Sequence, residues 1–287
     1  MGLIVLDANS LLAVWEEAEN LPLTRKALAL LHAAFPAMSR EQWAGVALGR
    51  RDWYLLYLRQ QLFGEQLDAV ASCPACGEKL ETGFTLGQIC PPGWELNRVP
   101  GHWQAHAPGA GGNELSTRPM LRLPAPDGCQ TLLASVPCSA DVLASSQLPA
   151  SALLQRCVQL VPDDAPPDGA TAVATSVPEP GQMMPNDVTH VLANDLNPAL
   201  LQTLAQKMQE LDPLAEIRID LQCPSCRHGW TLDFDIVQWL WQEIGDWASR
   251  MLQQVHALAQ AYGWSEASIL AMSAKRRRRY LELLGYS

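Results

Sequence analysis

The chain has 287 residues, of which 48% are hydrophobic and 17% charged, and its formal net charge is −10. This apolar content suffices for the core of one large domain or two modest ones, and the acidic balance opposes general nucleic-acid binding. The N-terminus lacks a basic segment before its apolar residues, and no apolar run approaches the roughly 18 residues of a membrane span. We therefore expect a cytoplasmic protein without membrane insertion.

Residues 1–65 are predicted to be helical. Ser10 is placed to cap a first helix, and Ser39 with Gln42 forms a capping-box pattern for a later one. The last helix of this part should end at Gly64, because glycine readily adopts the left-handed conformation that follows many helices.

Two similar segments, residues 66–86 and 215–235, are predicted to form β-hairpins. In each, apolar residues alternate with polar ones on both sides of a Cys-Pro-x-Cys sequence. This pattern is typical of two strands joined by a tight turn, so we expect each cysteine pair at the tip of its hairpin.

Residues 87–214 are predicted to be an insertion that contains loops, a small β part and helices. The Pro-rich stretches 91–118 and 162–187 are typical of loops. The sequence MLRLPAPDGCQTLLASV indicates a hairpin, and SALLQRCVQL a short helix that Ser151 can cap. Residues 157–206 contain no Lys or Arg, which favours a solvated loop over core, although a helix should begin near Pro198.

Residues 236–287 are predicted to form a C-terminal helical arm. Apolar residues recur every three or four positions from Ile236 to Tyr262, which predicts a helix about 40 Å long. Ser265 and Ser273 are placed to cap two short helices after it. The expected fold class is thus α+β: mostly helical, with two zinc-knuckle hairpins forming a zinc-ribbon-like centre, and a long C-terminal helix followed by two short ones.

The cysteines of the two hairpins are predicted to bind one structural zinc ion. Zinc prefers a tetrahedron of soft ligands, and both thiolates of a Cys-x-x-Cys turn can point at one ion. Cys73 and Cys76 would supply two ligands, and Cys223 and Cys226 the other two. Zinc ribbons space their pairs by about 15–20 residues, so the separation of 146 residues between Cys76 and Cys223 requires a long insertion. Four protein ligands leave no open position for water, which makes such a site structural.

Other interpretations of these cysteines remain open. A thioredoxin-like redox site places its Cys-x-x-Cys at the start of a helix, whereas both pairs here lead into predicted strands. The pairs could also pack without a metal, and His228 could replace Cys226 as a ligand. The remaining cysteines have no partner at ligand spacing and are interpreted as small core or loop residues: Cys90, Cys129, Cys138 and Cys157.

Catalytic motifs such as HExxH, GxSxG and the Walker loop are absent from the sequence. We therefore expect a protein that is not an enzyme and has no small-molecule substrate. The basic run from Lys275 to Arg279 is either a solvated helix face or a docking helix for an acidic protein surface. The alternative function is a zinc-ribbon regulatory protein that binds nucleic acid, which the net charge of −10 disfavours.

A resemblance to a known family is carried by three sequences: GRRDWYLLYLRQQLFGEQLDAVASCPACGEKLE, DPLAEIRIDLQCPSCRHGW and AYGWSEASILAMSAKRRRRYLELL. They resemble the baseplate proteins of phage-like contractile injection systems, which are similar to the T-even phage baseplate hub subunit or its assembly chaperone. The resemblance does not extend to the stretches 91–118 and 162–187.

This resemblance implies a non-enzymatic structural or assembly role, as a baseplate or hub component or as an assembly chaperone of a contractile tail-like particle. The implied partners are other baseplate or tail proteins. The chain would reside in the cytoplasm of the producing cell, with or without incorporation into the finished particle. The residues expected to bind partners belong to the closing part of the sequence: Trp264, Ile269, Leu270, Arg276, Arg277, Arg278, Arg279 and Tyr280.

Overall fold

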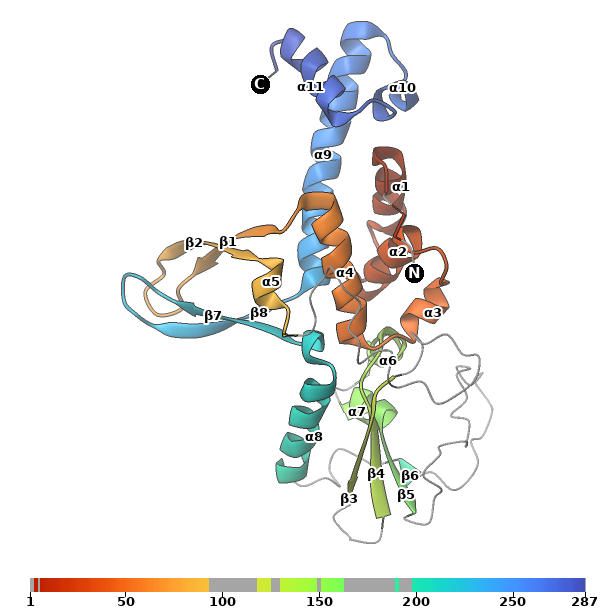
Figure 1. Cartoon of the computed structure of the whole chain (residues 1–287), viewed down its shortest axis with the longest axis vertical. Helices are drawn as coiled ribbons and strands as arrows, with labels where there is room; N and C mark the ends of the chain where they lie inside the picture. The colour runs from red at the N-terminus through yellow and green to blue at the C-terminus, as the bar shows by residue number, and fades with distance from the viewer. Residues whose placement is uncertain are drawn as a thin grey trace. The chain divides into compact units, whose positions relative to one another are not determined.

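The computed structural model describes residues 3–4, 6–92, 118–124, 130–148, 151–162, 189–190 and 198–286 (Figure 1). Helices and short antiparallel strands are mixed in it, and its contacts divide the chain into two compact units. The first unit comprises Met1–Ala44, Gly49–Ala105 and Leu214–Ser287; the second comprises Gly45–Leu48 and His106–Pro213. The predicted loops 91–118 and 162–187 lie almost entirely outside the described residues.

The N-terminal part of the chain forms four helices: α1 (Ala8–Ala18), α2 (Leu23–Ala34), α3 (Arg40–Ala44) and α4 (Leu48–Phe63). Phe35, Trp43 and Tyr54 pack together where α2, α3 and α4 meet, with ring centroids 5.1–5.8 Å apart. All three side chains are buried. Because large aromatic rings bury much apolar area each, this cluster is a major part of the first unit's core.

The ends of these helices follow local hydrogen-bonding chemistry. The predicted Ser10 cap is wrong: the carboxylate of Asp7 accepts the Ser10 backbone N–H at 2.8 Å and caps α1. The predicted capping box is confirmed, because Ser39 N–H donates to Gln42 Oε1 and Gln42 N–H to Ser39 Oγ. Gly64 has φ +89° after α4, which agrees with the predicted helix end.

Two antiparallel hairpins follow the helices in the first unit. One consists of β1 (Gln66–Ser72) and β2 (Lys79–Thr85), after which the short helix α5 (Leu86–Ile89) begins. The other consists of β7 (Ile217–Gln222) and β8 (Gly229–Phe234), and the short 3-10 helix η4 (Pro213–Ala215) precedes it. The two hairpins lie side by side (Figure 1).

The longest helix is α9 (Ile236–Tyr262), which begins directly after β8. Asp235 caps it by accepting the backbone N–H of Val237 at 2.8 Å, and Gly263 ends it in the left-handed conformation at φ +68°. Helices α10 (Glu266–Leu270) and α11 (Ala274–Leu283) pack against its C-terminal half. Their shared core contains five aliphatic side chains: Met251, Val255, Leu258, Ile269 and Leu270.

In the residues that the structure describes, the second unit contains a four-stranded antiparallel sheet and three helices. The strands lie in the order β3 (Met120–Pro124), β4 (Gln130–Ser135), β5 (Val158–Pro162) and β6 (Thr189–His190). The helices are α6 (Ser139–Ser145), α7 (Ser151–Cys157) and α8 (Pro198–Leu211).

The expectation that residues 157–206 form a solvated loop is wrong for the described parts of that stretch. Cys157, Val158 and Leu204 are buried, at 5%, 0% and 1% exposure, and they form the core of the second unit with Leu132 and Ala134. The lack of Lys and Arg in the described parts of this stretch therefore reflects buried strand and helix faces, which are apolar and carry no charge.

Candidate metal centre

Four cysteine thiols from the two hairpins come together in the first unit. Cys73 and Cys76 lie in the turn between β1 and β2, and Cys223 and Cys226 lie in the turn between β7 and β8. Their Sγ atoms are all within 4.8 Å of one another. Cys73 and Cys223 are buried, whereas Cys76 and Cys226 are exposed at the surface. The fold thus joins two chain segments that 146 residues separate.

The hairpins are equivalent position by position, with a constant offset in residue number. Leu67 pairs with Phe84 in the first hairpin, and Ile217 pairs with Phe234 in the second. The rings of Phe84 and Phe234 meet edge to face, with centroids 5.9 Å apart and an interplanar angle of 87°. This contact joins the two hairpins near the strand ends that are remote from the cysteine turns.

Each cysteine turn is closed by the same two backbone hydrogen bonds. In the first turn, Cys73 N–H donates to Glu78 O at 2.8 Å, and Gly77 N–H donates to Cys73 O at 2.9 Å. In the second turn, Cys223 N–H donates to the carbonyl of His228, and Arg227 N–H donates to that of Cys223, both at 2.9 Å. The backbone reversal requires a positive φ after the second cysteine, which is +75° at Gly77 and +60° at Arg227.

Replacing Gly77 by alanine should destabilise the protein by about 1 kcal/mol, because L-residues disfavour the left-handed region. Arg227→Gly at the equivalent position should change stability by less than about 1 kcal/mol, since relief of backbone strain offsets the greater freedom of the unfolded chain. Urea denaturation of the wild-type protein and the two variants measures both differences.

The comparison isolates backbone conformation from packing. A Cβ atom built on Gly77 has no neighbouring atom within 4 Å, so steric clash does not contribute to the expected loss. Gly87, which has an ordinary φ and only the Thr85 side chain near such a Cβ at 3.9 Å, is the matched glycine for an alanine control. If Gly77→Ala were as stable as Gly87→Ala, the left-handed requirement at the turn would be refuted.

The thiols approach one another in a reciprocal pattern. Cys73 Sγ lies 3.7 Å from Cys226 Sγ, and Cys76 Sγ lies 3.6 Å from Cys223 Sγ, so the first cysteine of each turn meets the second of the other. A tetrahedral metal with metal–sulfur bonds of about 2.3 Å has sulfur–sulfur edges of about 3.8 Å. A disulfide would instead require about 2.05 Å. The four cysteines could therefore bind one metal ion.

The thiols of the group differ in their ionisation. The backbone N–H of Cys226, and also that of Ser225, lower the pKa of Cys223 to about 7 despite burial. A backbone hydrogen bond at Glu78 lowers the pKa of Cys76, but hydrogen bonds to Cys226 and Cys223 outweigh it and raise the value to about 12. A pKa near 7 lets the Cys223 thiolate form at neutral pH, and the thiolate is the form that binds metal ions.

The other residues considered as ligands lie elsewhere. His228 does not belong to the four-thiol group, and its ring stacks on Trp230 with centroids 6.3 Å apart. Cys90 is half-buried, and Cys129 lies outside the described residues. In the second unit, Cys138 and Cys157 are buried, and burial raises the pKa of both thiols, that of Cys157 to about 12.

The residues predicted to bind partners fall into three groups by their burial in the structure. Ile269 and Leu270 are core residues at 0% and 8% exposure, and Arg277 is also buried at 5%. Trp264 and Tyr280 are half-buried and pack against each other edge to face. The remaining members lie on the exposed face of α11: Arg276, Arg278 and Arg279.

The burial of Arg277 was missed at the level of sequence, although a signal for it exists. Arg277 is spaced by three, four and seven residues from Tyr280, Leu281 and Leu284, which all pack against the core of the arm. This spacing places Arg277 on the apolar face of α11. Its neighbours in sequence, Arg276 and Arg278, point away from that face and are exposed.

Membrane spans and known relatives add no further assignment. Among the described helices, none is both long enough and apolar enough to cross a membrane. A scan of protein-family models, a search of curated proteins and a search of solved structures each found no match to the chain.

Proposed function

We propose that Cys73, Cys76, Cys223 and Cys226 bind one structural zinc ion, and that the chain is a non-enzymatic structural or assembly protein. The observation that supports this proposal is the convergence of four thiols from two distant hairpins within 4.8 Å. Sulfur-only tetrahedral sites suit zinc or iron. Zinc is the choice that needs no redox role, and four protein ligands leave it no position for a substrate.

The proposed place of this protein is the baseplate of a contractile tail-like particle, as a hub component or an assembly chaperone. The resemblance of its N-terminal and C-terminal sequences to such baseplate proteins supports this role. The form of the C-terminal arm is compatible with it, because α9 ends in a small helical head formed by α10 and α11. In α11, five basic residues accompany a single acidic one, so an acidic surface on another baseplate or tail protein is the proposed partner.

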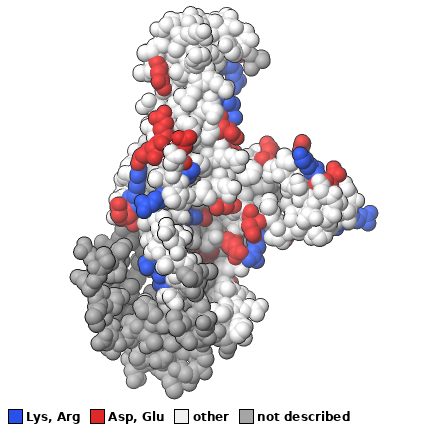
Figure 2. Space-filling model, turned by 180° about the vertical axis from the view of Figure 1, so that it is seen from behind, with Lys and Arg blue, Asp and Glu red and all other residues white. Residues whose placement is uncertain are grey.

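A zinc-ribbon nucleic-acid-binding regulator has less support. The two hairpin segments, residues 66–86 and 215–235, contain seven Asp or Glu residues and three Lys or Arg residues. Side chains of both signs occur on the hairpins in the view of Figure 2, without a continuous basic surface on that face. Phosphate binding depends on clustered positive charge, which these hairpins lack on balance.

The proposed role is tested in a producing cell whose own copy of the gene has been deleted. Restoring the wild-type chain should restore particle assembly, and a chain without residues 263–287 should not, while its hairpins still bind zinc. The reason is that the arm's head, which carries the basic residues of α11, is removed, whereas the four cysteines are left in place. Electron microscopy counts the particles, and elemental analysis measures zinc in the purified truncated protein.

Point variants guard against simple misfolding of the truncated chain. Arg276→Glu with Arg279→Glu reverses two exposed charges on α11 and should abolish assembly, because the proposed partner surface is acidic. The fold should be kept, because neither side chain contributes to the core. Arg25→Glu with Lys79→Glu changes the net charge equally at positions outside α11 and should assemble normally. Normal particles in cells that lack the gene, or with the truncated chain, would contradict the proposed role.

A further inference from the structure

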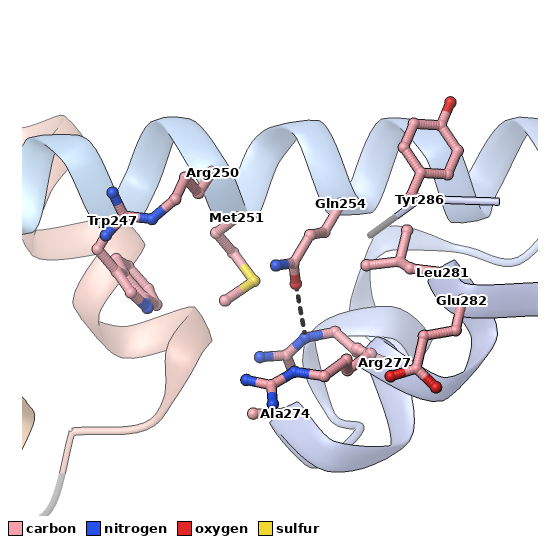
Figure 3. Close-up of a pocket in the computed structure, with 10 residues that line it drawn as sticks. Trp247, Arg250, Met251, Gln254, Ala274, Arg277, Leu281, Glu282 and Tyr286 are labelled. Atoms are coloured by element: carbon pink, nitrogen blue, oxygen red, sulfur yellow. Dashed lines mark hydrogen bonds between the residues drawn. The ribbon is translucent and has the colours of Figure 1, made fainter. Parts of the chain in front are cut away.

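A cavity of about 330 Å³ lies between α9 and α11 in the C-terminal arm. Figure 3 shows its lining side chains: Trp247, Met251 and Gln254 come from α9, and Arg277 extends from α11 toward Gln254. Trp247 and Gln254 are half-buried, whereas Met251 and Arg277 are buried. We call this feature the α9–α11 cavity.

Arg277 is a buried cation whose hydrogen-bond partners are all neutral. Its Nε donates to Gln254 Oε1 at 3.4 Å, and its Nη1 donates to the carbonyl oxygen of Met272. Among the described residues, no carboxylate lies within ion-pair distance of Arg277, and its Nη2 donates no hydrogen bond. Loss of solvent lowers the pKa of its guanidinium. Buried charges are normally paired, so an anionic group from outside the chain would stabilise the guanidinium of Arg277.

Two further guanidinium groups line the same cavity. Arg250 of α9 and Arg278 of α11 are exposed at its rim, and neither makes an ion pair with a described residue. Glu282 also lines the cavity, but its carboxylate pairs with Arg279 Nη1 at 2.9 Å. The cavity is lined by three arginines and by one acid, whose charge is already paired with Arg279. It is therefore positively charged, although the net charge of the chain is −10. A negatively charged ligand group is therefore favoured.

The walls of the cavity distinguish between kinds of anion. Trp247, Met251 and Leu281 provide apolar surface beside the guanidinium groups. A free phosphate would use the charges and leave this surface uncovered. A peptide with a carboxylate next to a large apolar side chain would use both, since a guanidinium can bind a carboxylate through two parallel hydrogen bonds. Charge and shape together thus point to a protein ligand.

We propose that the α9–α11 cavity binds an Asp or Glu side chain of a partner protein, with a large apolar residue next to it in the partner's sequence. The free Nη2 of Arg277 and the guanidinium of Arg250 donate to the carboxylate, while Trp247 and Met251 contact the apolar neighbour. This inference deepens the proposed assembly role and rests on it for the partner being a protein. It adds a specific binding site for one acidic side chain of the partner to the exposed basic face of α11.

A random twelve-residue peptide library displayed on phage provides the test. The immobilised full-length protein selects binders, and peptides that also bind the bare support are removed. The selected sequences should be enriched in Asp or Glu beside Leu, Ile, Phe or Trp. Synthetic versions should bind about tenfold or more weakly to Arg277→Gln, and also when their acid is replaced by the amide, and binding should weaken as salt is raised.

Matched variants separate the cavity from general charge and from misfolding. Arg276→Gln removes the same charge from an exposed position that does not line the cavity and should leave peptide binding unchanged. Arg250→Gln removes an exposed lining residue that makes no ion pair with a described residue, and it should weaken binding severalfold. No acidic enrichment, or equal binding to the wild-type, Arg277→Gln and Arg250→Gln proteins, would overturn the proposal.

The two proposals fail in different ways. If selected peptides depend on Arg277 but particles assemble without the chain, the cavity stands and the baseplate role falls. If particles need the chain but assemble normally with Arg250→Gln and Arg277→Gln, the role stands and the cavity is not the docking site.

Discussion

The purified wild-type protein is expected to contain one zinc ion per chain, and Cys223→Ser to abolish this binding and unfold both hairpins. An isolated two-stranded hairpin is marginally stable in water, so we expect each hairpin here to depend on the other and on the proposed metal. Structural zinc binding in finger peptides is worth about 10–16 kcal/mol, which exceeds the stability of many whole domains. Cys223 is the most sensitive position, because its thiol is buried and receives backbone N–H groups.

Hydrogen exchange measured by mass spectrometry checks this result strand by strand. Amides of β1, β2, β7 and β8 should exchange more than about a thousandfold faster in Cys223→Ser, which corresponds to a loss of about 4 kcal/mol. The same change should appear when a chelator removes the metal from the wild-type protein. Cys90→Ser removes a thiol outside the cluster and should keep both the zinc and the protection. Protected hairpins in a metal-free sample would refute the proposed role of zinc.

The convergence of the four cysteines could be predicted because the sequence repeats one pattern twice. Leu67, Cys73 and Phe84 in the first hairpin have the same spacing as Ile217, Cys223 and Phe234 in the second. Alternating polarity around Cys-Pro-x-Cys predicts strand, turn and strand, and the chemistry of paired thiols supplies a reason for two such turns to meet. The mixed helix-and-strand class of the fold follows from the same periodicities.

The second unit could be predicted less well from sequence. Strand β5 begins at Val158 directly after α7 ends at Cys157, so one apolar run contains parts of two element types. Periodicity does not distinguish a strand from a helix over so few residues. The pairing of β5 with β4 connects chain segments on either side of α6 and α7, and such non-local contacts leave no mark on local composition.

Charged residues that the fold buries were the least predictable. Arg50, Arg51, Asp52 and Arg59 of α4 are buried at 3–8% exposure. Charged side chains are normally at the surface, and the exceptions depend on partners from elsewhere in the chain. Arg51 finds its partner next to it in Asp52, with Nε and Oδ1 2.7 Å apart. Arg59 pairs with a residue of α9, which nothing in the sequence of α4 indicates.

Glu243→Leu is expected to destabilise the protein by about 3–5 kcal/mol, because it leaves the buried guanidinium of Arg59 without a counter-charge. Arg59 Nη2 and Nε donate to the two carboxylate oxygens of Glu243 at 2.7 and 2.9 Å, and Nη1 donates to Gly64 O at 2.7 Å. The side chain of Arg59 is 3% exposed and that of Glu243 26%. This ion pair joins α4 to α9 beside the start of the first hairpin.

Arg59→Met should cost less, about 1–2 kcal/mol, because the partly exposed carboxylate of Glu243 can regain water. In the double variant Arg59→Met with Glu243→Leu, apolar side chains replace both charges, so stability should return to within about 1 kcal/mol of the wild type. Urea denaturation followed by both circular dichroism and tryptophan fluorescence measures all corners of this double-mutant cycle.

The exposed ion pair between Arg40 and Glu17 is the matched control, with a 2.6 Å contact and side chains 39% and 54% exposed. Glu17→Leu should cost less than about 1 kcal/mol, because the unpaired Arg40 remains solvated. The difference in stability between the two single variants is therefore the decisive result. Loss of its partner should destabilise the buried Arg59 cation more than the half-exposed Glu243 carboxylate. Equal costs for Glu243→Leu and Arg59→Met would mean that water reaches Arg59 and that α4 and α9 separate readily at this point.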